Sequence, residues 1–91
     1  MEAPVSYSVR IKGQVQGVSF RYAAREEAAR RNIRGFVRNE RDGSVYMEIE
    51  GARESVEAFL QWCEKGPLGA NVAQTIANEM PIRSFERFEI Q

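Results

Sequence analysis

The sequence predicts an α+β fold in which two helices cover one face of a mainly antiparallel sheet. Two segments repeat apolar side chains at helical spacing, with charged residues between them, as amphipathic helices do. Shorter segments around them alternate apolar and polar residues, which is typical of strands with one buried face. The resulting order is β-α-β-β-α-β with an additional C-terminal strand.

The N-terminal third predicts a strand followed by a helix. Residues 7–11 carry apolar side chains at every second position, which predicts a strand. Residues 20–31 place apolar side chains at helical spacing among arginines and glutamates, which predicts an amphipathic helix. Asn32 and Gly35 then end the helical pattern.

The middle third predicts a β-hairpin. We expect strands at residues 36–39 and 45–50, and the Asp42–Gly43 pair between them predicts a two-residue turn. The second strand alternates apolar side chains with Tyr46, Glu48 and Glu50, and Gly51 ends it. Its acidic side chains, Glu48 and Glu50, are therefore expected on a sheet surface that faces solvent.

The C-terminal third predicts a helix and two strands. Apolar side chains within residues 56–63 recur at helical spacing, and Gly66–Pro67 ends the helix. A strand follows at residues 72–77, Pro81 interrupts the pattern, and a last strand is expected within residues 85–90. Two helices with one apolar face each would cover one face of the sheet, which is the ferredoxin-like sandwich.

Length and composition indicate one domain, residues 1–91, and exclude several kinds of chemistry. Thirteen basic residues balance thirteen acidic ones, so a highly charged polyanion is a poor default partner, and we expect no nucleic acid. The chain has no histidine and one cysteine, so a bound metal is not expected, and neither a Ser-His-Asp nor a Cys-His site is possible within it. No apolar run is long enough to span a membrane and no signal-peptide pattern opens the chain. We expect a cytoplasmic monomer without a cofactor.

The stretch from Gly13 to Arg21 is the strongest candidate for a binding site. It joins a predicted strand to a predicted helix, and a glycine-bearing loop there directs backbone N–H groups and the positive helix end toward one point. Arg21 adds a planar cation, so the loop is typical of a phosphate site; an ordinary turn beside a solvated arginine is the alternative. Asn39 ends a strand of the same sheet, where it could hold a water molecule or simply precede the turn.

Three stretches of the sequence resemble one family. Val15-Gln16-Gly17-Val18-Ser19-Phe20-Arg21, preceded by Gly13, resembles the acylphosphatase signature G-x-V-Q-G-V-x-F-R. Gly35-Phe36-Val37-Arg38-Asn39-Glu40-Arg41-Asp42-Gly43-Ser44-Val45 is similar to the family's G-W-V-R-N-x-x-D-G-x-V. Supporting matches are Glu50-Gly51, Phe59, Gly66-Pro67, Ala70 and Val72.

The resemblance implies an enzyme that hydrolyses the carboxyl-phosphate bond of small acyl phosphates by attack of water. It implies no metal and no covalent intermediate, with inorganic phosphate as product and inhibitor. The phosphate-binding residues it implies are Val15, Gln16, Gly17, Val18, Ser19, Phe20 and Arg21. The implied catalytic residues are Arg21, which binds the phosphoryl group, and Asn39, which positions the attacking water. Ser19 would supply a further hydroxyl or cap the helix.

Two other functions fit the same element order. An RNA-binding module is the main alternative, because Arg34-Gly35-Phe36-Val37 matches part of its aromatic motif, although the central strand offers only Tyr46. A regulatory domain for a small ligand is the second. Away from the loop, Cys63 is expected to be a small core residue and Trp62 to lie at the rim of the core.

Overall fold

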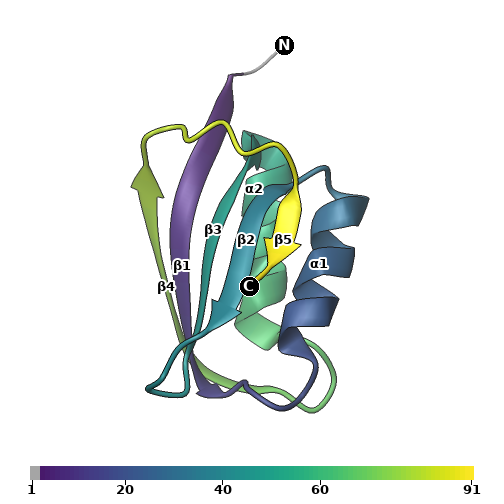
Figure 1. Ribbon diagram of the computed structural model, residues 1–91, viewed down its shortest axis with the longest axis vertical. Helices are drawn as coiled ribbons and strands as arrows, with labels where there is room; N and C mark the ends of the chain where they lie inside the picture. Colours follow the sequence, from purple (N-terminus) through teal and green to yellow (C-terminus); the bar gives the residue numbers. More distant parts are fainter. Residues whose placement is uncertain (1–2) are drawn as a thin grey trace.

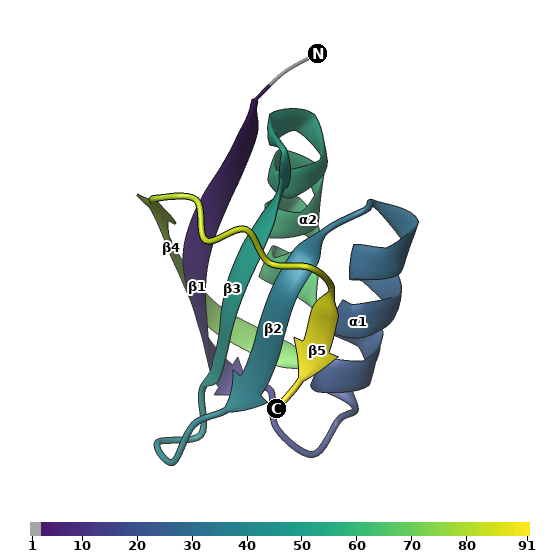
Figure 2. The same ribbon diagram turned by 45° about the horizontal axis from the view of Figure 1, so that its top comes forward.

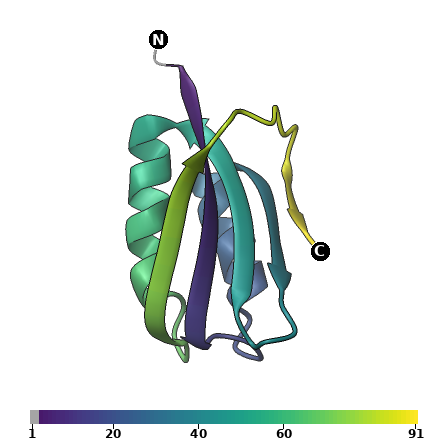
Figure 3. The ribbon, with the colours of Figure 1, turned by 90° about the vertical axis from the view of Figure 1, so that its left-hand side faces the viewer.

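One five-stranded sheet forms the centre of the computed structural model, which describes residues 3–91 (Figure 1). The strands and helices are β1 (Pro4–Gln14), α1 (Phe20–Arg30), β2 (Arg34–Asn39), β3 (Val45–Ala52), α2 (Arg53–Lys65), β4 (Asn71–Met80) and β5 (Phe88–Ile90). The strand order is β4-β1-β3-β2-β5, and only the β2–β5 pair is parallel. Both helices lie on one face of the sheet (Figures 1 and 3), which confirms the predicted α+β, ferredoxin-like architecture.

The core lies between the sheet and the helices. Side chains at alternate positions of the central strands point into it, including Val9, Met47 and Ile49, none of which has any exposed surface. Phe20 from α1 and Phe59 from α2 pack against them from the other side. Complete burial of a side chain of this size stabilises the fold by about 1.5–3 kcal/mol. Cys63 is also fully buried, as predicted, and Trp62 packs edge-on against Phe20 at the rim.

The turn between β2 and β3 differs from the expected two-residue turn. The strands end at Asn39 and resume at Val45, so five residues connect them. Asp42 does not adopt the positive φ that a two-residue Asp-Gly turn requires; only Gly43 does, at +93°. Instead, the Asp42 carboxylate accepts hydrogen bonds from the Ser44 N–H at 2.9 Å and the Ser44 hydroxyl at 2.6 Å. This Asx-type bonding stabilises a wider loop, because the side chain replaces a main-chain partner.

The open face of the sheet is partly covered, which corrects the expectation that Glu50 faces solvent. Residues 81–87, which we call the crossing segment, run in front of β1, β3 and β2 on their way from β4 to β5 (Figure 2). Glu50 lies beneath this segment and is 1% exposed. Phe85 belongs to the segment rather than to the last strand, and its ring packs at 6.0 Å from the ring of Phe36.

The Glu50 carboxylate holds the crossing segment in place. It accepts hydrogen bonds from the main-chain N–H groups of Arg83, Ser84 and Phe85 at 2.8–3.1 Å. The Ser6 hydroxyl donates a fourth bond at 2.6 Å. Burial by itself would raise the pKa of Glu50, but these hydrogen bonds outweigh it and lower the pKa below its ordinary value of 4.5.

The helix ends follow the sequence signals. The N–H of Gly66 donates to the carbonyl of Trp62 at 2.8 Å, and the glycine has a positive φ of +68°, so α2 ends where Gly66–Pro67 predicts. Within residues 3–91, no helix has both the length and the apolar character needed to cross a membrane.

Candidate active site

The loop from β1 to α1 has the backbone conformation of an anion-binding turn. Gly17 has φ +77° and Ser19 has φ +60°, so left-handed residues recur along the loop. Such alternation turns successive N–H groups toward one side. A Cβ atom on Gly17 would meet no atom within 4 Å, so the position favours glycine for its backbone conformation and not for lack of space.

The first turn of α1 leaves its N–H groups without protein partners. Its first internal bond runs from the N–H of Ala23 to the carbonyl of Ser19 at 3.0 Å. Among the described residues, nothing accepts a hydrogen bond from the main-chain N–H groups of residues 16–22. The first turn also contains no acidic side chain. These unpaired donors, together with the positive end of the helix, favour an oxyanion at this point.

Ser19 does not cap the helix. A capping serine has an extended backbone, whereas Ser19 is left-handed (φ 60°, ψ 29°), and its hydroxyl forms no capping bond. The capping role considered for it is therefore wrong. The side chain is exposed and lines the pocket described below, where its hydroxyl is available to a ligand.

Arg21 is oriented by the C-terminal end of the described chain. Its Nη1 donates to the main-chain oxygen of Gln91 at 3.0 Å, and the N–H of Gln91 donates to the carbonyl of Val37 at 2.8 Å. Gln91 thus links the guanidinium on α1 to the backbone of β2. A guanidinium has five N–H donors, so this contact leaves most of them free for an anion.

Gln16 ties the β1–α1 loop to the β2–β3 loop. Its Nε2 donates to two carbonyl oxygens, that of Glu40 at 2.7 Å and that of Ser44 at 2.9 Å. Glu40 directly follows Asn39, so the side-chain amide of Gln16 fixes the loop relative to Asn39. Gln16 therefore offers a ligand its main-chain N–H, while its side chain is already engaged.

A pocket of about 220 Å³ brings the predicted residues together. The side chains and backbone that line it are those of Val15, Gly17, Ser19, Phe20, Arg21, Tyr22 and Asn39. Val15 and Phe20 are buried and form its apolar base, whereas Asn39 is exposed at its edge. The predicted proximity of Asn39 to the loop is confirmed.

Two predicted loop residues do not line this pocket. Gln16 reaches the β2–β3 loop instead, and Val18 lies beside Gly69 in the loop that follows α2. Conversely, the pocket includes Tyr22, which belongs to none of the sequence motifs. Its position in the first turn of the predicted helix was the available signal. Gln91 acts through its main chain, so its residue type carried no signal.

The Cys63 thiol is not a candidate nucleophile. It lies in the core with no exposed surface, and burial raises the pKa of its thiol, with the carboxylates of Glu27 and Glu64 adding to the effect. A protonated, enclosed thiol is a poor nucleophile. The fold and the loop therefore define a small α+β domain with a candidate anion-binding pocket, which is lined by backbone donors, one arginine and one amide side chain.

Comparison with known proteins identifies the family. The acylphosphatase family model matches residues 7–90. An acylphosphatase from Burkholderia vietnamiensis is 41% identical over 87 residues, which cover 94% of this chain and 89% of the relative. One from Anaeromyxobacter is 54% identical over 65 residues, which cover 71% of this chain and 70% of the relative.

Solved structures of acylphosphatases share the fold of this chain. A crystal structure of acylphosphatase from Bacillus subtilis superimposes with a TM-score of 0.93 at 31% identity, covering 96% of this chain and 98% of that one. An acylphosphatase from Coxiella burnetii gives a TM-score of 0.94 at 28% identity, covering 97% and 93%. The chain belongs to the acylphosphatase family, whose members are hydrolases of acyl phosphates.

Proposed function

We propose that this chain hydrolyses acyl phosphates to a carboxylate and inorganic phosphate by direct attack of water, without a metal or a covalent intermediate. One observation carries the proposal: a single pocket is lined by loop and helix residues whose N–H groups are unpaired (Gly17 and residues 19–22), by Arg21 with its guanidinium and by Asn39 with its amide. These groups offer charge stabilisation to a phosphoryl group and a polar contact to a water beside it.

The loop N–H groups and Arg21 bind the phosphoryl oxygens. During transfer, negative charge is spread over these equatorial oxygens, and donors fixed in advance stabilise it. Arg21 is suited to this task because its planar fork matches two oxygens at once. Its bond to Gln91 restricts the rotation of the guanidinium before the substrate arrives.

Asn39 positions the attacking water. The water oxygen forms a bond to phosphorus while the bond from phosphorus to the carboxylate oxygen breaks, and the electron pair leaves with the carboxylate. An amide is not a useful proton acceptor, so the proton from water goes to a phosphoryl oxygen. A carboxylate is a good leaving group, so positioning contributes more than a strong base.

The alternative mechanisms lack suitable groups in this chain. The sequence has no histidine to serve as a general base or metal ligand, and its one cysteine is enclosed in the core. We propose that the chain acts in the cytoplasm as a monomeric single domain, with inorganic phosphate as a competitive inhibitor at the loop.

The test is hydrolysis of benzoyl phosphate in ¹⁸O-labelled water with EDTA present. We expect phosphate release with the label in phosphate and none in benzoate, because water attacks phosphorus. Label in benzoate, or activity lost to EDTA and restored by zinc or magnesium, would contradict the mechanism. A parallel gel shift with single-stranded RNA tests the binding-module alternative, for which we expect no complex.

A further inference from the structure

A second cavity lies between α1 and β5, away from the phosphate-binding loop. Its volume is about 330 Å³, at the lower end of the range for sites that bind small molecules. We call it the α1–β5 pocket. The residues that line it are Arg25, Ala28, Ala29, Asn32, Ile33, Arg34 and Phe88. None of them belongs to the phosphate-binding loop.

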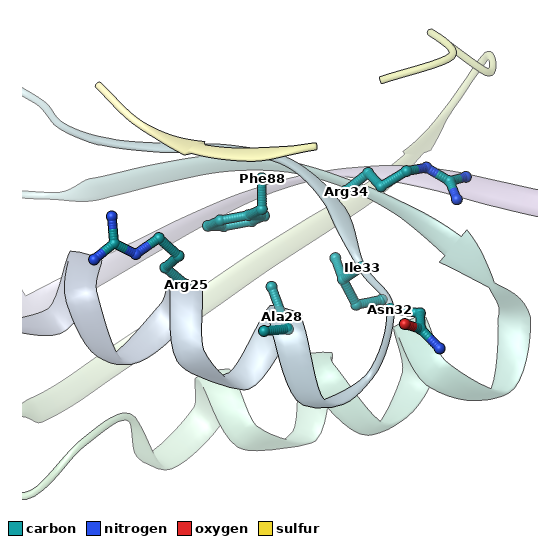
Figure 4. A pocket seen from close by; sticks show the side chains of 7 residues that line it. Arg25, Ala28, Asn32, Ile33, Arg34 and Phe88 are labelled. Carbon is teal, nitrogen blue, oxygen red and sulfur yellow. The ribbon is translucent and has the colours of Figure 1, made fainter. Parts of the chain in front are cut away.

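The interior of the α1–β5 pocket is apolar. Figure 4 shows the ring of Phe88 reaching from β5 toward Ala28 on α1, with Ile33 beside them. Ala28 and Ile33 are buried, whereas Phe88 is only half-buried. Of the three α1 residues that line the cavity, two are alanines, at positions 28 and 29, so the space exists because these side chains are short. A compact apolar group would cover the exposed part of Phe88 and remove it from water.

Arg25 places an uncompensated cation at one end of the pocket. It is exposed, and no described carboxylate lies within ion-pair distance of it. Its guanidinium carbon lies 5.5 Å from the centre of the Tyr22 ring. At the other end, Arg34 extends away from Phe88 (Figure 4), and the Glu50 carboxylate lies 3.6 Å from it. Among residues 3–91, no acidic residue lines the cavity.

We propose that the α1–β5 pocket binds a small carboxylate with a compact apolar body, such as an aromatic carboxylate. The apolar body would pack between Phe88 and Ala28, and the carboxylate would pair with Arg25. Asn32 at the opposite end offers an amide to a polar substituent. The ligand class follows from the lining and its charge, and the site is independent of the proposed reaction.

The test is an amide NMR titration with benzoate, in the presence of saturating phosphate to occupy the loop. We expect saturable shifts that cluster at residues 25–33 and at Phe88. The neutral analogue benzamide should bind more weakly, by about fivefold, because it lacks the charge-assisted bond to Arg25. Shifts confined to residues 15–21, no shifts at millimolar benzoate, or equal affinity for benzamide would overturn the proposal.

Two variants locate the site. Arg25→Gln should reduce benzoate affinity to that of benzamide and leave benzamide binding unchanged. The matched control is Arg53→Gln, at an exposed arginine at the start of α2, and this variant should bind benzoate like the wild type.

Ala29→Leu should abolish binding of both probes by filling the cavity, while Ala29→Ser should retain it. Retained binding in a folded Ala29→Leu protein, or equal losses in the Arg25 and Arg53 variants, would contradict the assignment.

Discussion

We predict that the planar fork of the Arg21 guanidinium matters more to the proposed reaction than its charge alone. We predict that Arg21→Ala lowers kcat/KM by roughly 10²-fold or more, on the scale of removing one preorganised donor from a transition state. Arg21→Lys should recover little of this loss, because an ammonium cannot reproduce the planar fork. Steady-state kinetics on benzoyl phosphate measure both.

The control for this experiment is Arg53→Lys, which changes an exposed arginine far from the loop. It should leave kcat and KM unchanged. The role assigned to Arg21 would be wrong if a folded Arg21→Lys enzyme retained most of the wild-type activity.

Asn39 should affect turnover without affecting phosphate binding. It lies at the exposed edge of the pocket, whereas the phosphoryl donors come from the loop. We predict that Asn39→Ala lowers kcat by ~10²-fold, the cost of removing one positioned polar group. The dissociation constant of inorganic phosphate, measured by titration, should change little. A folded variant that turns over normally, or one that no longer binds phosphate, would sink this assignment; Asn78→Ala on β4 is the control.

At the scale of elements, a contact between the β1–α1 loop and the β2–β3 loop holds the two sides of the candidate site together. The side chain of Gln16 donates to the carbonyls of Glu40 and Ser44. Gln16→Glu has nearly the same shape but replaces the donor with an acceptor that repels both carbonyls. We predict that it lowers kcat by roughly tenfold, because a small displacement of Asn39 misplaces the water.

Gln74→Glu on β4 makes the same chemical change at an exposed position and should have no effect. The backbone amides of residues 40–44 should shift in NMR spectra of the Gln16 variant and not in those of the control. Unchanged turnover in the Gln16→Glu enzyme would show that the two loops are positioned independently.

The contact between Glu50 and the crossing segment should make the free energy of unfolding depend on pH. The pKa of Glu50 is lowered in the folded protein, so the unfolded chain binds the proton more tightly. The stabilisation from this group is therefore present above its ordinary pKa of 4.5 and is lost as pH falls through the lower folded value. We predict that the Glu50→Gln variant unfolds at a lower urea concentration than the wild type at neutral pH. The difference between their urea midpoints should shrink below about pH 4.

Urea titrations at several pH values measure this difference, with Glu54→Gln, an exposed position on α2, as the control. If the difference between the urea midpoints stayed constant from neutral pH to strongly acidic pH, proton binding at Glu50 would not be coupled to folding.

The elements that the sequence predicted are those with a local signal. Both helices, the hydrophobic alternation of β1 and β3, and the end of α2 at Gly66 follow from spacing and turn chemistry. The burial of Glu50 could not be predicted in this way, since its partners lie in the crossing segment, more than thirty positions later. The same holds for Gln91, whose contact with Arg21 spans most of the chain and uses only backbone atoms.

At the scale of the whole molecule, the reacting pocket is assembled from distant parts of one sheet and one helix. Backbone donors come from the β1–α1 connection, the amide from the end of β2, and the partner of Arg21 from beyond β5. The order of the strands places these ends at one edge of the fold (Figure 1). The sequence motif therefore indicated most of the residues that line this pocket, but not Tyr22, and the sheet determines how far apart they lie.

The central position of β1 has a consequence for how the chain folds. Val9 pairs with Met47 on one side and with Ala77 on the other, so β1 has no neighbour in the sheet from its own part of the sequence. Closing such long loops costs entropy before the strand contacts form. We predict slow refolding for a domain of this size, on the order of milliseconds to seconds. Stopped-flow measurements of Trp62 fluorescence would show this, and a microsecond phase carrying the full amplitude would contradict it. Until β4 pairs with it, one backbone edge of β1 remains open to strands of other chains, so refolding at high protein concentration should favour aggregation.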